Sequence, residues 1–332
     1  MPRISVVIPS YNHGRFLRAC IEGIRKQTFQ DWEILLIDDG SKDDSVELAR
    51  QIAESEPRLR IFVNEQNLGT YGTEQKGVEM SDSEFVAILN SDDLWTPEKL
   101  AKQVQALDEN KEAALCYVLG WKIDDNDKVD ETDDVHFDWP TAERQELLPY
   151  LLYENRVLAS SVLFRRQGLK FDTSCRYSGD WVALLNRSFE KPVACVPERL
   201  SYWRMHDNNT FTISPRQVLE EIRVREAIDR DHPRWHLARL AKNQVDAGLA
   251  KNAMNLCALY VLGGDIHKAR KAIKAAIRLH PNKQVAWKRA AATLLPLEKV
   301  RARLWPNLDS KLSSEDLKAV KEGLTQIKPL RW

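Results

Sequence analysis

Short apolar runs alternate with helical patterns through the first hundred residues, and this alternation constrains the fold more than any other feature. The apolar runs span 4–9, 33–37 and 85–89, and a further strand is expected over 59–63. Uninterrupted runs of this length are typical of strands covered on both faces, as in parallel sheets. Between them, apolar side chains recur with helical spacing, for example over 15–27. We therefore expect an α/β fold with a mostly parallel, Rossmann-like sheet and crossover helices.

Three further helices are expected in this part of the chain. One begins at Asp43 or Asp44, either of which can cap it, and runs to about residue 55. Another covers 72–80. A third opens after residue 95, with Thr96 as its cap and Pro97 in its first turn.

Polar clusters follow three of the predicted strands, at 9–12, 38–41 and 90–93. The carboxyl ends of parallel strands lie along one edge of a sheet, where open α/β folds bind their ligands. Neither GxGxxG nor GxxxxGK[ST] follows the first strand. A dinucleotide-binding domain and a P-loop nucleotidase are therefore both disfavoured.

Composition excludes other classes. The 49 basic and 49 acidic residues balance, which argues against a nucleic-acid-binding protein. The N-terminus reads as neither a signal peptide nor an anchor. Five scattered cysteines without a CxxC pair argue against a disulfide framework or a cysteine zinc site. We expect a cytoplasmic, reduced protein.

The C-terminal third is rich in Ala, Leu, Lys and Arg and is predicted to be helical. A helix-turn-helix unit of the tetratricopeptide type fits the spacing of Tyr260, Gly264, Ala269, Ile273, Ala276 and Pro281. A second, partial unit begins at Trp287. We therefore divide the chain into an α/β domain at 1–215, with halves at 1–110 and 111–215, and an α-helical extension at 216–332.

Basic residues concentrate in this extension: 266–305 holds eleven Lys or Arg and one acidic residue. Two interpretations of the amphipathic stretch 292–306 stay open. It can lie on anionic lipid as a peripheral contact at the inner face of the cell membrane, or it can pack as a helix with a solvated basic face.

Acidic residues mark two of the strand ends. Asp92 and Asp93, after Asn90 and Ser91, supply the hard oxygen ligands that suit Mg²⁺ or Mn²⁺ together with phosphate oxygens. The same stretch can instead cap the next helix. Asp39 can accept a hydrogen bond from the N–H of a uracil or thymine ring, or it can serve an Asp-Gly turn.

The segments "SVVIPSYNHGRFL", "ILLIDDGSKDDS", "NLGT" and "FVAILNSDDLWTPEKL" resemble the nucleotide-sugar domain of family 2 glycosyltransferases of the GT-A type, over roughly 1–210. The resemblance implies a nucleoside-diphosphate sugar as donor and the roles that follow. Residues along the nucleotide would be Pro9, Tyr11, Asn12, Asn67, Asn90, Ser91 and Asp92, with Asp39 on the base. Asp92, Asp93 and His206 would lie at the metal, and Asp180 would be the catalytic base.

Sugar transfer needs a base for the acceptor hydroxyl and a cation for the leaving diphosphate. A single carboxylate base favours direct displacement and hence inversion. We expect a uridine donor first, and a glycan or lipid-linked acceptor for which Trp181 would form a stacking platform. Asp180 can alternatively cap a helix, and His206 can be a loop histidine.

Two positions depart from the family pattern. Asn90 stands where the aspartate motif usually begins with Asp. Glu74 stands where a basic residue is usual, which reverses the charge expected near the phosphates, and Lys76 follows on another helical face. These departures keep an inactive binding or scaffold protein open as an alternative. A nucleotidyltransferase is disfavoured because only Gly14 follows the first strand.

Overall fold

The structure is a computed structural model. It describes residues 1–136, 139–141, 147–206, 215–231, 239–281, 284–294 and 299. The chain forms two compact units, one of residues 1–151 and 155–208 and the other of 152–154 and 209–332. We describe each unit by itself. The domain limits given above stay a prediction.

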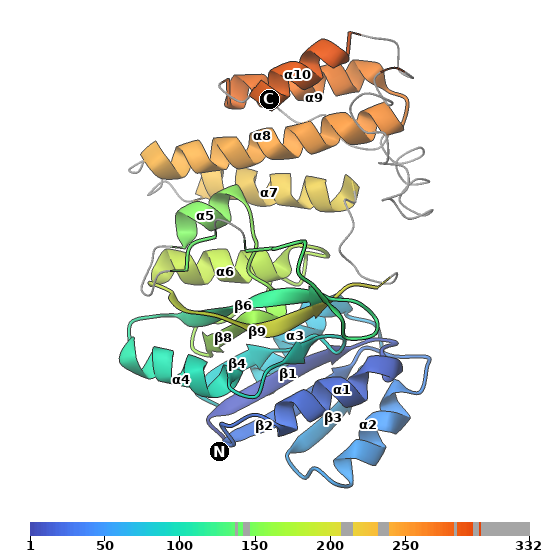
Figure 1. Ribbon diagram of the computed structural model, residues 1–332, viewed down its shortest axis with the longest axis vertical. Helices are drawn as coiled ribbons and strands as arrows, with labels where there is room; N and C mark the ends of the chain where they lie inside the picture. Colours follow the sequence, from blue (N-terminus) through green and yellow to red (C-terminus); the bar gives the residue numbers. More distant parts are fainter. Residues whose placement is uncertain are drawn as a thin grey trace. The chain divides into compact units, whose positions relative to one another are not determined.

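A single mixed sheet of nine described strands forms the middle layer of the first unit (Figure 1). The strands are β1 (Ile4–Ser10), β2 (Trp32–Asp38), β3 (Leu59–Val63), β4 (Phe85–Ile88), β5 (Leu94–Trp95), β6 (Leu115–Ile123), β7 (Val129–Asp130), β8 (Val162–Arg165) and β9 (Ala194–Arg204). Their order is β3-β2-β1-β4-β8-β6-β9-β5, with β7 paired to β6. The four predicted strands are confirmed as β1 to β4, and they are mutually parallel.

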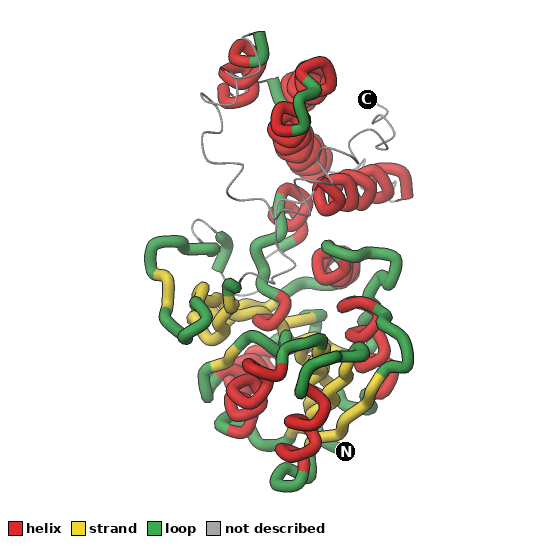
Figure 2. The backbone as a smooth tube through the Cα atoms, turned by 90° about the vertical axis from the view of Figure 1, so that its right-hand side faces the viewer, coloured by secondary structure: helices red, strands yellow, loops and turns green. Residues whose placement is uncertain are grey.

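Helices cover both faces of this sheet, and Figure 2 shows the strands running between them. The helical segments here are α1 (Gly14–Arg25), α2 (Ser45–Ala53), α3 (Gly69–Met80), α4 (Lys99–Glu109), α5 (Leu148–Tyr153), η1 (Ala159–Ser161) and α6 (Gly179–Glu190). Leu17 and Ile21 of α1 share a core with Val6 of β1. Gly77 of α3 lies against Val7, the next residue of β1, so α1 and α3 cover opposite faces.

Two helix starts differ from expectation. α4 begins at Lys99 instead of at Thr96–Pro97, because Leu94 and Trp95 first pair with β9 as the short strand β5. The predicted cap is wrong: Thr96 Oγ1 has no hydrogen-bond partner among the described residues. At α2 the N-cap position is Asp44, whose side chain makes no capping hydrogen bond, and Asp43 Oδ1 accepts from the backbone N–H of Ser45 at 3.1 Å instead.

The second unit is helical in its described residues. It contains α7 (Pro215–Asp231), α8 (Arg239–Leu262), α9 (Ile266–Leu279) and α10 (Gln284–Ala292). The predicted helix-turn-helix is present as α8 and α9, which share a core that includes Tyr260, Ala269, Ile273 and Ala276. Gly264 occupies the turn with a φ of +86°, and Asp265 caps α9 by accepting from Lys268 N.

The amphipathic stretch 292–306 lies mostly outside the described residues, so both interpretations of it stay predictions. Among the helices that are described, none is both long and apolar enough to cross a membrane.

Candidate functional site

The three polar clusters meet at one edge of the sheet. Ser10 pairs with Asp38 where β1 and β2 end, and the N–H of Leu89 bonds to Val7 of β1. Since β1 lies between β2 and β4, the loops that follow these strands leave the sheet side by side. This is the position at which open α/β sheets bind ligands.

The two aspartates in the loop after β2 have different hydrogen-bond partners. Asp38 holds the turn: its Oδ1 accepts from the N–H groups of Gly40 and Ser41 at 3.0 and 2.8 Å. Gly40 has a φ of +82°, which favours glycine. The turn therefore depends on the Asp38 side chain and leaves that of Asp39 for other partners.

Asp39 is 4 % exposed and organises the segment that precedes α3. Its Oδ1 accepts from Asn64 Nδ2 at 2.9 Å and from Leu68 N at 2.8 Å, and its Oδ2 accepts from Gly69 N at 2.9 Å. A carboxylate offers about four lone-pair sites, so these bonds leave about one for a ligand. Asn67 closes the same segment by donating to the Asp39 carbonyl at 3.1 Å.

The loop after β1 presents Tyr11 and anchors Asn12. Pro9 is buried within β1, opposite Ile37. Tyr11 is 47 % exposed. Asn12 has a φ of 55°, and its Oδ1 accepts from Lys42 N at 2.7 Å, which ties this loop to the one after β2. Of these three predicted nucleotide contacts, Tyr11 and Asn12 are exposed and Pro9 is buried.

Asp93 does not join the metal-binding group predicted for it. It is 2 % exposed, and its Oδ1 accepts from Arg204 N at 3.0 Å. Its Oδ2 accepts from Ser160 Oγ at 2.5 Å and from Asn90 Nδ2 at 3.4 Å. Burial, followed by the charge of Asp92, raises the pKa of Asp93 to about 8. The hydrogen bonds of Asp93 therefore connect the loop after β4 to β9 and η1.

A different trio can hold a cation. His13, Asp92 and His206 each offer a ligand atom, and these atoms lie within 4.8 Å of one another. His206 Nε2 lies 3.0 Å from Asp92 Oδ2. Two imidazoles and a carboxylate form a donor set that suits a divalent metal. Sequence reasoning selected Asp92 and His206 but missed His13, whose only signal was its place beside Asn12 at the end of β1.

Hydrogen-bond contacts fix both the backbone and the imidazole ring of His13. It precedes α1, and its N–H donates to Ser45 Oγ at 3.2 Å. Its Nδ1 lies 2.8 Å from the Oγ of Ser91, a residue that is 1 % exposed. Desolvation by burial lowers the pKa of His13, which favours the neutral imidazole that metals bind.

Asp180 lies in the first turn of α6, and Ser178 occupies the N-cap position. The alternative in which Asp180 itself caps this helix is therefore wrong. Its Oδ1 accepts from the Tyr71 hydroxyl at 3.1 Å, and the helix N-terminus also favours its negative charge. The side chain of Asp180 is partly exposed.

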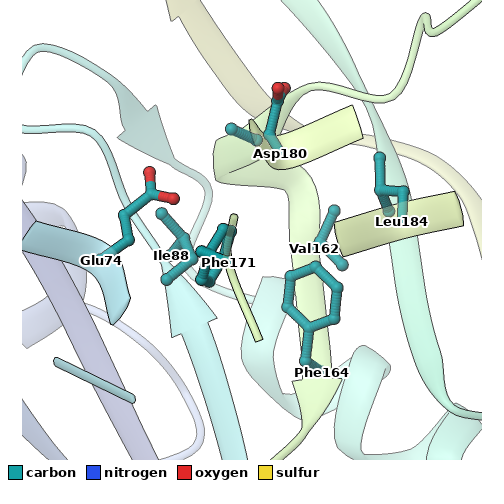
Figure 3. Close-up of a pocket in the computed structure, with 8 residues that line it drawn as sticks. Glu74, Ile88, Val162, Phe164, Phe171, Asp180 and Leu184 are labelled. Atoms are coloured by element: carbon teal, nitrogen blue, oxygen red, sulfur yellow. The ribbon is translucent and has the colours of Figure 1, made fainter. Parts of the chain in front are cut away.

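Glu74 and Asp180 both line one small pocket (Figure 3). The other walls are apolar and come from Ile88, Ala159, Val162, Phe164, Phe171 and Leu184. Glu74 is 1 % exposed, and its Oε2 has no hydrogen-bond partner in the described part of the chain. Burial and the charge of Asp180 raise the pKa of Glu74 well above its ordinary value. Glu74 is therefore a buried side chain in an apolar pocket, and its environment disfavours the negative charge that the sequence suggested near the phosphates.

Trp181 is not an exposed platform. It is 3 % exposed, and its Nε1 donates to the carbonyl of Leu151 at 2.8 Å. A stacking platform needs an open ring face, so this prediction is wrong. Asp180 is partly exposed, whereas the next residue of the helix points into the core.

The strand order and the ligand-binding edge define a GT-A-type α/β fold. A solved structure from S. aureus, TarS 1–349 in complex with UDP-GlcNAc, superposes with a TM-score of 0.64 at 16 % identity, over 98 % of this chain and 92 % of that one. The mannosyltransferase PcManGT from Pyrobaculum calidifontis, in complex with GDP-Man and Mn²⁺, gives a TM-score of 0.57 at 16 % identity over 92 % and 88 %. At such identities these matches establish the fold.

The sequence model described as glycosyl transferase family 2 matches residues 5–170, which is half of the chain. The chain therefore belongs to glycosyl transferase family 2, as its sequence motifs predicted.

Curated relatives agree with this assignment. An uncharacterized glycosyltransferase of Nostoc sp., alr2836, is 28 % identical over 216 residues, which is 62 % of this chain and 66 % of that protein. Glycosyltransferase GlyG of Streptococcus pneumoniae is 39 % identical over 108 residues, or 32 % and 36 %. The chain thus spans between about one third and two thirds of the length of these two relatives.

Proposed function

We propose that this chain is a metal-dependent, inverting glycosyltransferase. It would move a sugar from a nucleoside diphosphate, UDP first, to a hydroxyl of a glycan or lipid-linked acceptor. The observation that carries the proposal is the trio of His13, Asp92 and His206 at the ligand-binding edge of a GT-A-type sheet. This trio lies among the loops assigned to the nucleotide.

Donor binding is assigned to the loops after β1, β2 and β4. The exposed ring of Tyr11 suits the face of a base, and the acceptor capacity left on Asp39 suits an imide N–H. Asn12, Asn67, Asn90 and Ser91 hold these loops in place through the bonds described above. Two proteins of like fold support the donor class, since one is described with UDP-GlcNAc and the other with GDP-Man.

Asp92 and His206 would hold the divalent cation, Mn²⁺ or Mg²⁺, and the trio of donor atoms fits such an ion. When bound, it would neutralise charge on the departing diphosphate. Asp93 supports these ligands indirectly, because it fixes Arg204 next to the segment that carries His206. The complex of PcManGT with Mn²⁺ supports a divalent ion in a protein of this fold.

Asp180 would act as the base. Its carboxylate would accept the proton of the acceptor hydroxyl while the acceptor oxygen bonds to the anomeric carbon and the bond to the diphosphate oxygen breaks. The Tyr71 hydroxyl orients the carboxylate from one side. A single displacement of this kind inverts the anomeric configuration.

The acceptor site has no assigned residue, because Trp181 is buried. We retain a glycan or lipid-linked acceptor and a cytoplasmic enzyme as parts of the proposal. A peripheral membrane contact through the basic C-terminal stretch also stays a prediction, since most of that stretch lies outside the described residues.

A transfer assay with Asp180→Asn tests the role of the base. We expect a panel of nucleoside-diphosphate sugars to identify one donor for the native chain, and the variant to lose about 10²- to 10⁴-fold in rate while it still binds nucleotide. NMR of the product would give the anomeric configuration. Asp172→Asn is the matched control, because Asp172 precedes α6 on the exposed surface. Native rates in the Asp180 variant, or retained configuration, would refute the mechanism.

The alternative of an inactive binding protein makes a different prediction in the same assay. It would bind nucleotide with the cation but release no nucleoside diphosphate from any donor and acceptor combination. The Asp180 carboxylate, oriented by the Tyr71 hydroxyl, favours the enzyme.

A further inference from the structure

The cation-capable trio contains a ligand that the aspartate motif does not supply. His13 comes from the loop after β1, Asp92 from the loop after β4, and His206 from the segment after β9. Each residue is far from the other two in the sequence, and the ligand atoms nevertheless come within 4.8 Å of one another. Convergence of this kind needs three separately positioned loops.

The spacing suits one cation. Metal–nitrogen and metal–oxygen bonds of about 2.1 Å place two ligands at a right angle ~3.0 Å apart. His206 Nε2 and Asp92 Oδ2 share a hydrogen bond at that separation of 3.0 Å, and a cation bound by both atoms would replace this bond. The rings of His13 and His206 are perpendicular, with centroids 5.6 Å apart, so they approach the shared space from different directions.

The surroundings of His13 also match those of a metal ligand. The contact between Nδ1 and Ser91 Oγ leaves Nε2 as the nitrogen for a cation, and an outer hydrogen bond of this kind fixes the tautomer and ring direction. The Phe16 ring lies beside both imidazoles: its centroid is 6.0 Å from that of the His13 ring and 5.1 Å from that of the His206 ring. An apolar ring here limits solvent access to the site.

We propose that His13 completes a two-histidine, one-carboxylate site that selects first-row transition cations over Mg²⁺ and Ca²⁺. Imidazole ligands favour ions such as Co²⁺, Ni²⁺ and Zn²⁺, whereas Mg²⁺ prefers oxygen. A site of Asp92 and His206 alone would discriminate less. The inference rests on the cation site of the proposed function, but it concerns the identity of the ion and the role of His13.

Calorimetry on the full-length, chelator-treated chain tests this without any transfer reaction. We expect the native chain to bind one Co²⁺ more tightly than Mg²⁺ by at least tenfold. His13→Ala should weaken Co²⁺ binding at least tenfold and change Mg²⁺ binding by about twofold at most. His267→Ala is the matched control, because His267 is exposed on α9, and it should bind as the native chain does.

Two further measurements keep the inference falsifiable if His13→Ala fails to fold. Ser91→Ala removes only the outer partner of Nδ1 and should weaken Co²⁺ binding about tenfold. In the native chain loaded with Co²⁺, NMR should show paramagnetically shifted N–H protons from two imidazoles. Native Co²⁺ affinity in His13→Ala, one shifted imidazole, or tighter binding of Mg²⁺ than of Co²⁺ would each overturn the inference. Loss of transfer with normal His13-dependent Co²⁺ binding would instead count against the proposed function alone.

Discussion

Replacing Glu74 by Gln should make the stability of the protein less sensitive to pH. Glu74 is completely buried among apolar side chains and faces the charge of Asp180, so its pKa in the folded state lies well above the ordinary 4.5. Between these two pKa values the unfolded chain ionises this residue while the folded chain keeps its proton. The free energy of unfolding therefore falls as pH rises through that window.

The size of the effect follows from proton linkage. One proton held by the folded state and lost by the unfolded state costs about 1.4 kcal/mol of stability per pH unit. Between pH 5 and pH 7 this amounts to roughly 2.7 kcal/mol, as an upper limit for a group that stays protonated throughout. Gln keeps the shape and the hydrogen-bonding ability of the neutral acid without an ionisable proton.

Urea denaturation at pH 5, 6 and 7, followed by tryptophan fluorescence, measures the difference between the two chains. We expect Glu74→Gln to gain stability relative to the native chain progressively as pH rises. Glu79→Gln is the matched control, since Glu79 lies on the same helix but is exposed. A difference between Glu74→Gln and the native chain that stays constant over this range would refute the reasoning, because Glu74 would then ionise equally in both states.

Two other substitutions test the packing on which the account depends. Gly179→Ala would place a Cβ 2.4 Å from Cγ of the Tyr71 ring. We therefore expect the free energy of unfolding to fall by about 1–3 kcal/mol and Tyr71 to move away from Asp180. An unchanged melting temperature would contradict this expectation. In the second unit, buried Arg225 donates to the carbonyls of Leu152 and Tyr153 and to Asn252 Oδ1. Arg225→Met should therefore lower the free energy of unfolding by about 3 kcal/mol, as measured by calorimetry. The control Arg223→Met changes an exposed residue and should leave the free energy of unfolding nearly unchanged.

The central sheet could be predicted because its signal is local. β1, β2 and β4 are covered on both faces, so their sequences are uninterrupted apolar runs. The placement of polar clusters at their carboxyl ends then followed from parallel pairing alone. No comparable local signal marks β8, which has four residues and pairs only with strands distant in the sequence.

The errors come from contacts between distant residues. α3 begins at Gly69, earlier than the predicted residue 72, because the Asp39 carboxylate captures the N–H groups of Leu68 and Gly69. Asp93 was assigned to the metal because adjacent carboxylates look equivalent in a sequence. Its bonds to Ser160 and Arg204 span 67 and 111 positions and turn it into a structural residue.

The candidate cation site also contains residues that the sequence predicted and one that it did not. Asp92 and His206 were selected through family motifs, and the structure brings them together. His13 carries no motif of its own. Its relevance depends on the left-handed backbone of Asn12 and on the contact with Ser91, neither of which a sequence pattern reveals.

The most direct test of the central claim is a calorimetric titration of UDP into the full-length chain with and without Mn²⁺, for the native protein and for Asp92→Ala. We expect UDP binding that strengthens markedly with Mn²⁺ in the native chain and loses that dependence in the variant. UDP binding that is equal with and without the cation, or that is unaffected by loss of Asp92, would contradict a donor site built around this carboxylate.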